Sequence, residues 1–231
     1  MASDVRALFG AFGGVMAVAC LEGRMGRVLA ARGGRSAAAE LGDFAFFAGE
    51  PAEELLRATC AEIVVAQNAL WRALRPQWRA FPRWAFGEAP ADVGRLRERA
   101  AVPAGYELRA LDAETAALCR AQEWSRDLAA GHMGEGCEGF VLLRGGEVCA
   151  GAAAYARSSR GASIQVDTRA DLRRRGLAGC CAANYILRCL ERGLWPEWDA
   201  HTRASAALAE RLGYGGRREY TALLRGGQSG A

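Results

Sequence analysis

Hydrophobic residues change their spacing along the chain, and each spacing predicts a different element. Near the N-terminus they recur every three or four residues, as in one helix with a face toward the core. These residues are Leu8, Phe12, Val15, Met16 and Ala19. Residues 43–48 form a short apolar run that predicts a strand. A longer helix is predicted from Pro51 to about Leu74, because proline is favoured at the first helical position and two acidic residues follow it.

After residue 105 the pattern indicates an alternation of strands and helices. The predicted strands are 106–110, 140–144, 147–155, 162–168, 196–200 and 219–224, and the predicted helices are 112–128, 177–192 and 203–212. Gly145 and Gly146 supply the positive φ angles of a tight hairpin turn. This order predicts an α/β (α+β) fold with a mixed central sheet flanked by helices.

A change in composition indicates where two domains meet. Pro90, the charged stretch 95–99 and Pro103 are typical of a connection. We therefore predict an N-terminal α/β region over residues 1–103 and a second domain over residues 104–231.

Composition excludes several classes of protein. The 231 residues are 51% hydrophobic and 24% charged, which is typical of a globular chain and not of a disordered one. All 30 basic residues are arginine, so Schiff-base lysines, Walker lysines and serine–lysine pairs are excluded. The net charge of +4 is modest and evenly distributed, which argues against nucleic-acid binding.

The eight cysteines form no C-x-x-C pair, and His132 and His201 lie far apart in the sequence. We therefore expect no metal site and interpret the cysteines as buried thiols in a reducing compartment, which favours a cytoplasmic location. The uncharged run 7–21 has two interpretations, a signal peptide or a buried helix. The helix is favoured, because the charges of Asp4 and Arg6 cancel and the run is shorter than the ~18 residues of a membrane span.

Residues 71–84 interleave tryptophan and phenylalanine with arginine. Aromatic rings beside arginines can stack on single-stranded nucleic acid. The alternative is that the tryptophans belong to the core and the arginines cover them. We favour the core, because the segment stands alone.

The segment 163–190 carries the strongest chemical signal, an arginine-rich loop between a predicted strand and a predicted helix. Gly176 lets backbone approach a ligand closely, and the free N–H groups and dipole of a helix N-terminus attract anions. The expected ligand is a phosphate or pyrophosphate, although a solvated basic loop is the alternative. The Walker and G-x-G-x-x-G patterns are both missing.

The six residues 173–178, with the sequence RRRGLA, resemble the R/Q-x-x-G-x-G/A acetyl-coenzyme-A loop of the GNAT N-acetyltransferase superfamily. The preceding residues 164–168 are similar to its cofactor-facing strand, and residues 198–205 and 208–214 are similar to its later strand and helix. With residues 193–196, the set resembles the branch that includes the zwittermicin-resistance acetyltransferases, which carry an extra N-terminal region.

The resemblance implies a role for each matching position. Backbone N–H groups from Arg174 to Ala178 would hold the pyrophosphate, and Val166 and Thr168 would lie along the pantetheine. A strand N–H near Val166 or Asp167 would polarise the thioester carbonyl. The full set of implied cofactor-binding residues is Val166, Asp167, Thr168, Arg173, Arg174, Arg175, Gly176, Leu177, Ala178, Thr202 and Ser205.

The chain departs from the family at two places. Thr202 and Ala209 stand where the family often has an asparagine and a proton-donating tyrosine. Thr202 either binds the cofactor or caps a helix, and Ala209 cannot donate a proton.

An acceptor amine is protonated at neutral pH, with a pKa near ~10, so a base is required. Asp167 is the first candidate, with an ion pair to the arginine loop as its alternative role. His201 is the second candidate, with a capping or surface role as its alternative, and Gln165 is not titratable. Three residues around a glycine-rich loop either form the acceptor pocket or belong to a flexible turn. They are His132, Glu135 and Glu138.

The resemblance implies transfer of acetyl from acetyl-CoA to a primary amine of a small molecule, by direct attack in a ternary complex. We expect a monomer or homodimer with no metal and no nucleic-acid or membrane partner. The N-terminal region is expected to form one wall of the acceptor site. The alternative is a regulatory module that binds CoA without catalysis.

Overall fold

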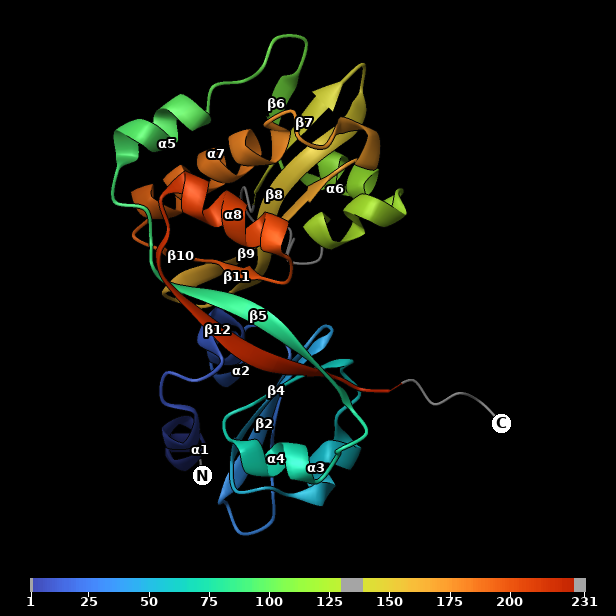
Figure 1. Ribbon diagram of the computed structural model, residues 1–231, viewed down its shortest axis with the longest axis vertical. Coiled ribbons are helices and arrows are strands. Elements are labelled where there is room, and N and C mark those ends of the chain that lie inside the picture. The colour runs from blue at the N-terminus through green and yellow to red at the C-terminus, as the bar shows by residue number, and fades with distance from the viewer. Residues whose placement is uncertain (1, 130–138, 227–231) are drawn as a thin grey trace. The chain divides into compact units, whose positions relative to one another are not determined.

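The computed structural model describes residues 2–129 and 139–226, and its contacts divide the chain into two compact units (Figure 1). Unit 1 comprises residues 1–83 and 219–231, and unit 2 comprises residues 84–218. Two strands, β5 (Arg79–Glu88) and β12 (Gly215–Leu224), contribute residues to both units.

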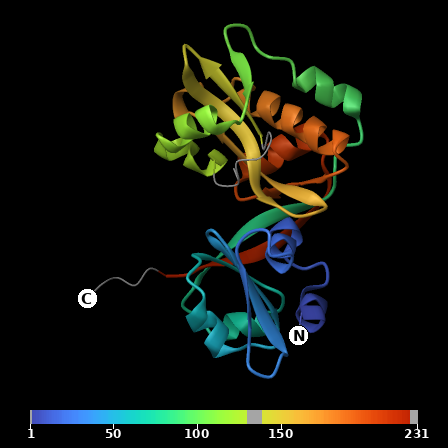
Figure 2. The same ribbon diagram turned by 180° about the vertical axis from the view of Figure 1, so that it is seen from behind.

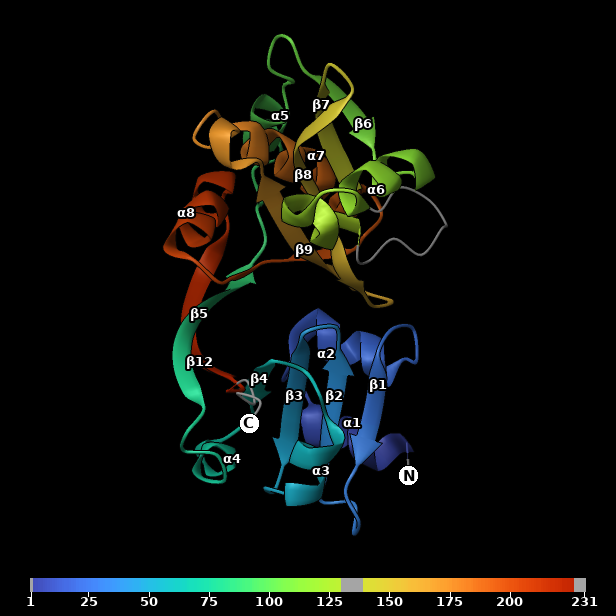
Figure 3. The ribbon, with the colours of Figure 1, turned by 90° about the vertical axis from the view of Figure 1, so that its right-hand side faces the viewer.

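The strands of unit 1 belong to a sheet with the order β1-β2-β3-β4-β12-β5-β11, and helices lie on both faces of β1, β2 and β3 (Figure 3). The other elements of unit 1 are α1 (Ala2–Phe9), α2 (Gly14–Leu21), β1 (Arg27–Ala30), β2 (Ser36–Leu41), β3 (Phe44–Gly49), α3 (Glu53–Ala58), β4 (Ile63–Ala66) and α4 (Ala69–Ala73). Successive residues of β3 point to opposite faces. Phe46 therefore meets Phe12 edge-on, whereas Phe47 packs on Trp71 of α4. Phe9 of α1 stacks on Phe12, and α3 shares the core of Phe47. Helices α1 and α3 therefore lie on opposite sides of the strands (Figure 3).

One helix prediction in this unit is confirmed in part, since Val15, Met16 and Ala19 are buried in a helix, and another was wrong. The run 7–21 forms two helices, because Gly10 and Gly13 adopt positive φ angles of 53° and 84° and interrupt it. The predicted helix from Pro51 to Leu74 is α3, β4 and α4, since the β-branched run from Ile63 to Val65 pairs as a strand with β3.

The strand predicted at residues 43–48 is confirmed as β3. The tryptophans of the 71–84 segment are buried: Trp71 is 2% exposed, Trp78 9% and Trp84 6%, as the core interpretation predicts. Six of the cysteines are also buried, whereas Cys60 is exposed. Among the described residues, no helix is long and apolar enough to cross a bilayer.

Unit 2 contains a five-stranded sheet in the order β10-β9-β8-β7-β6. Its elements are α5 (Val93–Arg99), β6 (Glu107–Ala110), α6 (Ala113–Arg120), the 3-10 helix η1 (Glu123–Ala129), β7 (Gly139–Arg144), β8 (Glu147–Arg157), β9 (Gly161–Thr168), the 3-10 turn η2 (Ala170–Leu172), α7 (Leu177–Glu191), β10 (Trp195–Glu197), β11 (Asp199–Ala200) and α8 (Arg203–Leu212). Helices α6 and α7 lie on opposite faces of this sheet (Figure 2).

Most predicted elements of this unit are confirmed, including the 145–146 hairpin, β9, α7 and α8. The predicted helix 112–128 instead divides into α6 and η1. The predicted strand 196–200 divides as well: β10 pairs with β9, and β11 pairs with β5.

The chain passes from unit 1 to unit 2 between Arg83 and Trp84 and returns to unit 1 between Arg218 and Glu219. The domain boundary predicted near residue 103 stays a prediction, and residues 84–103 belong to unit 2. Leu96 of α5 is fully buried in the α7 core, and Asn184 Nδ2 of α7 donates to the Ala100 carbonyl at 2.8 Å.

Candidate functional site

The turn before α7 has an unusual backbone. Arg174 has a φ of 64°, a left-handed conformation that side chains disfavour, and Gly176 follows with a φ of 82° as the N-cap of α7. A turn of this kind presents successive N–H groups on one concave side and favours anions. Backbone strain at Arg174 therefore accompanies a geometry suited to a phosphate.

The N–H groups at the start of α7 are available to a ligand. Within the described chain, the backbone N–H groups of residues 174–179 have no hydrogen-bond acceptor. The first intrahelical bond runs from the Cys180 N–H to the Gly176 carbonyl. Gly176 and its three preceding arginines are exposed, so the dipole of the 15-residue helix faces solvent there.

Strand β9 leads into this turn and is only half paired on one edge. Strand β10 pairs with Gly161, Ala162 and Ser163 and then ends. Beyond Ser163, no described strand pairs with that edge, while β8 continues along the other edge to Thr168. Burial changes at the same point, since residues 161–163 are buried and residues 164–168 are half-buried. The open edge can therefore pair with the amides of an extended ligand.

The ladder with β8 shows which face each β9 side chain occupies. Val166 and Thr168 lie opposite Ala152 and Ala150, which belong to the core under α7. The Thr168 hydroxyl oxygen is buried and has no hydrogen-bond partner among the described residues. A ligand along the open edge would supply the missing partner.

Asp167 points to the other face of the sheet, toward α6 and η1. It lies opposite Gly151, where a Cβ would contact Leu128 of η1. Gln165 Nε2 donates to Asp167 Oδ2 at 2.7 Å, so the carboxylate is held by its own strand and not by an arginine of the loop. Arg173 Nε instead points to the Thr168 carbonyl at 3.5 Å.

The environment of Asp167 favours its protonated form. Burial raises the pKa of this carboxyl above its ordinary value. The hydrogen bond from Gln165 lowers the pKa and so opposes the effect of burial. The negative charge of Asp127 raises the pKa further, and the positive charge of Arg173 lowers it. A carboxylate with raised proton affinity next to an open strand edge is suited to accept a proton.

The α8 residues predicted to bind the cofactor make structural hydrogen bonds. Thr202 caps α8, its hydroxyl accepting from the Ser205 N–H at 3.1 Å. Ser205 Oγ accepts from Trp198 Nε1 at 3.2 Å. His201 is exposed just before this cap. The middle of α8 lies near the start of α7, since a Cβ on Gly179 would lie 3.8 Å from Leu208.

Sequence reasoning missed two contributors to this site, Asp127 and the hydrogen bond from Gln165. The i, i+2 spacing of Gln165 and Asp167 on a strand was a usable signal, because it places both on one face. Asp127 carried no such signal, since its position depends on how η1 packs. The predicted acceptor-pocket residues His132, Glu135 and Glu138 lie outside the described residues.

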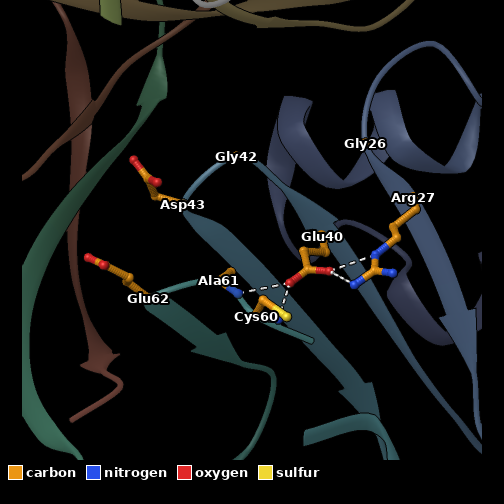
Figure 4. Close-up of a pocket in the computed structure, with 8 residues that line it drawn as sticks. All are labelled: Gly26, Arg27, Glu40, Gly42, Asp43, Cys60, Ala61 and Glu62. Carbon is orange, nitrogen blue, oxygen red and sulfur yellow. Dashed lines mark hydrogen bonds and ion pairs between the residues drawn. The ribbon is translucent and has the colours of Figure 1, made fainter. Parts of the chain in front are cut away.

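A hollow of about 520 Å³ lies in unit 1 (Figure 4). Its buried carboxylate, Glu40, accepts from the N–H groups of Cys60 and Ala61 and pairs with Arg27. These contacts lower the pKa of Glu40 against the effect of its burial. Asp43 and Glu62 line the same hollow. The Glu40 network joins β1, β2 and the loop before β4, which is a structural role.

Comparison with known proteins gives two matches that bear on function. A family model described as GNAT acetyltransferase matches residues 6–223. The structure of a GCN5-related N-acetyltransferase-like protein from Streptococcus suis 89/1591 is 36% identical, covers 97% of this chain and 99% of that chain, and superposes with a TM-score of 0.87.

Other matches are partial or more distant. The uncharacterized N-acetyltransferase YdfB of Bacillus subtilis is 33% identical over 90 residues, which cover 38% of this chain and 34% of that protein, so the chain matches about a third of this relative. A GCN5-related N-acetyltransferase from Kribbella flavida is 17% identical, covers 89% of this chain and 92% of that chain, and has a TM-score of 0.60. This last similarity supports the fold alone.

Proposed function

Because the chain belongs to the GNAT acetyltransferase family, we propose that it transfers an acetyl group from acetyl-CoA to a primary amine of a small molecule. The observation that carries the proposal is the half-paired edge of β9 leading directly into the anion-binding turn of α7. An extended arm with a diphosphate at one end matches that arrangement. The acceptor would attack directly, in a ternary complex.

The residues present fit the cofactor at three points. The backbone N–H groups from Arg174 to Ala178 would hold the pyrophosphate, and the exposed arginines would add charge-assisted hydrogen bonds. Val166 and the orphaned hydroxyl of Thr168 would lie along the pantetheine. Thr202 and Ser205 would meet it through their remaining hydrogen-bonding capacity.

Acetyl-CoA would supply a thioester. The acceptor nitrogen would form a bond to the carbonyl carbon, and the carbon–sulfur bond would break with its electron pair leaving on sulfur. The resulting thiolate would take up the proton that the nitrogen loses. A backbone N–H near Val166 or Asp167 would stabilise the charge on the carbonyl oxygen. Asp167 would first remove a proton from the acceptor ammonium and become a neutral acid. His201 is the second candidate for this step.

Proton donation to the leaving group does not require a tyrosine in this account. Ala209, at the position where the family often has one, is fully buried and has no proton to give. A thiolate is a good leaving group, since a thiol has a pKa of only ~8.5. The thiolate would therefore leave without a general acid, and water would relay to it the proton that the nitrogen loses.

We also propose that the chain is of the zwittermicin-resistance type of GNAT enzyme. The support is the set of sequence similarities around residues 166–168, 193–196 and 198–200 together with the extra N-terminal region. An antibiotic or metabolite amine is the kind of acceptor this placement suggests.

A second candidate is a CoA-binding regulatory module without catalysis. The glutamine at residue 165 and the alanine at residue 209 favour it, because neither can transfer a proton. Release of free thiol from acetyl-CoA in the presence of an amine panel separates the two functions. An enzyme releases thiol in proportion to the acetylated amine, whereas a binding module releases none.

Titration calorimetry with CoA tests the binding site. Gly176→Val places a side chain at the N-cap of α7, where the diphosphate would sit, and should abolish binding. Gly193→Val is the matched control, since Gly193 also has a positive φ and an open Cβ position, but at the other end of α7. Equal affinity of the two variants would refute the assignment of the turn.

A further inference from the structure

Gln165 holds one oxygen of Asp167 and leaves the other available. The two residues are two apart on β9 and share the face toward α6 and η1. Gln165 Nε2 donates to Asp167 Oδ2 at 2.7 Å. Among the described residues, none donates a hydrogen bond to Asp167 Oδ1. The amide therefore fixes the rotation of the carboxylate and leaves Oδ1 free to receive a proton.

Asp127 lies on η1, which packs on the face of the sheet that Asp167 occupies. Its neighbour Leu128 lies over Gly151, the residue directly opposite Asp167 in the β8–β9 ladder. The Asp127 side chain is exposed, and its charge raises the pKa of Asp167. An ammonium group entering beside Asp167 would therefore meet two carboxylates, one held and one exposed to solvent.

Two other groups near Asp167 complete its electrostatic surroundings. Arg173, in the turn after β9, favours the ionised carboxylate. Cys119, on α6, is fully buried, and burial raises its pKa to about 11, so the thiol is neutral at physiological pH. Strand β8 contributes no charge here, since Gly151 and Ala153 face Asp167 and Gln165.

We propose that Gln165 is a positioning residue that orients the Asp167 carboxylate to receive the proton of the acceptor ammonium, and that the exposed carboxylate of Asp127 draws that ammonium in. The inference rests on the proposed function, because it requires Asp167 to receive the acceptor's proton. In that step the N–H bond of the ammonium breaks, an O–H bond forms at Oδ1, and a neutral amine remains beside a neutral acid.

The test is a carbon-13 NMR titration of the Asp167 carboxyl in the full-length protein, assigned by its loss in Asp167→Asn. Gln165→Leu removes the hydrogen bond and should move the titration to higher pH. Asp127→Asn removes the nearby negative charge and should move it to lower pH. Matched controls in unit 1, Gln67→Leu and Asp43→Asn, should leave it unchanged.

Kinetics give a second readout. The acidic limb of the pH dependence of kcat/KM should follow the two NMR shifts, and Gln165→Leu should lower kcat/KM about tenfold, as expected for loss of a hydrogen bond to a charged group. Asp127 is exposed, so its variant tests the proposal even if Gln165→Leu fails to fold.

The outcomes separate this inference from the proposed function. An unchanged Asp167 titration in both variants, or shifts in the same direction, would overturn the inference whatever the activity. Absence of thiol release by the wild-type protein would refute the proposed function, and the NMR titration would still report on the coupling.

Discussion

Gly151 lies directly opposite Asp167 in the β8–β9 ladder, and a Cβ at residue 151 would come within 2.6 Å of Leu128 Cδ1. The missing side chain lets η1 pack closely on the sheet, which places Asp127 near Asp167. A glycine on one strand thus shapes the surroundings of the proposed base on the next.

Gly151→Ala should therefore disturb both stability and the site. Overpacking against Leu128 is expected to lower the free energy of unfolding by about 1–3 kcal/mol, measured by urea denaturation. Gly87→Ala is the control, because a Cβ there meets its nearest neighbour at an ordinary 3.6 Å. Equal losses in the two variants would contradict the close packing of η1.

The left-handed conformation of Arg174 predicts opposite effects on stability and binding. Arg174→Gly should leave the free energy of unfolding unchanged or raise it by about 1 kcal/mol, because glycine adopts a φ of 64° without strain. The same change should weaken CoA binding, since one loop cation is lost.

Arg175→Gly provides the comparison, because Arg175 is not among the residues with positive φ. It should weaken CoA binding similarly but lower the free energy of unfolding by up to about 1 kcal/mol. Identical stability changes in the two glycine variants would count against the strain at Arg174.

The raised pKa of Asp167 makes stability depend on pH. The folded state binds the Asp167 proton more tightly than the unfolded chain, so stability is lost as pH rises from the ordinary value of 3.8 through the raised pKa. Asp167→Asn should therefore be more stable than the wild type at pH 7, with the difference vanishing below about pH 4.

Thermal melts from pH 3 to pH 8 check this dependence. The same variant should lose about 100-fold or more in kcat/KM if Asp167 is the base. A wild-type protein more stable than the variant at pH 7 would show that the carboxylate is better stabilised than its burial indicates.

The contribution of Glu40 to folding stability depends on pH in the opposite sense to that of Asp167. The pKa of Glu40 is lowered, so its contribution is present above the ordinary carboxyl pKa and is lost as pH falls through the lower folded value. Glu40→Gln should lower the free energy of unfolding by about 2 kcal/mol at pH 7, by weakening its bonds to Arg27 and two N–H groups. Glu62→Gln, an exposed acid in the same hollow, should change it by less than about 0.5 kcal/mol. Similar effects for the two variants would contradict the structural role of Glu40.

Most elements of unit 2 were predictable because local signals define them. Gly145 and Gly146 mark the hairpin, Thr202 caps α8 and Gly213 ends it. The turn before α7 could likewise be expected from the arginines and Gly176, since a helix N-terminus needs only local sequence to form, and its binding of an anion stays a prediction.

Features that depend on distant packing could not be predicted in this way. The run from Ile63 to Val65 fits a helix face as well as a strand, and pairing with β3 decides between them. Residues 196–200 look like one strand, although the chain changes sheets between Glu197 and Asp199. The approach of Asp127 to Asp167 depends on η1 packing over Gly151, which no local pattern reports.

The central claim is that the N-terminus of α7 and the open edge of β9 bind acetyl-CoA. The most direct measurement is the change in backbone amide chemical shifts of the nitrogen-15-labelled protein on addition of CoA. We predict that the largest changes fall at residues 174–179 and along residues 164–168. Saturating CoA that leaves both segments unchanged, or that perturbs other residues instead, would contradict the account.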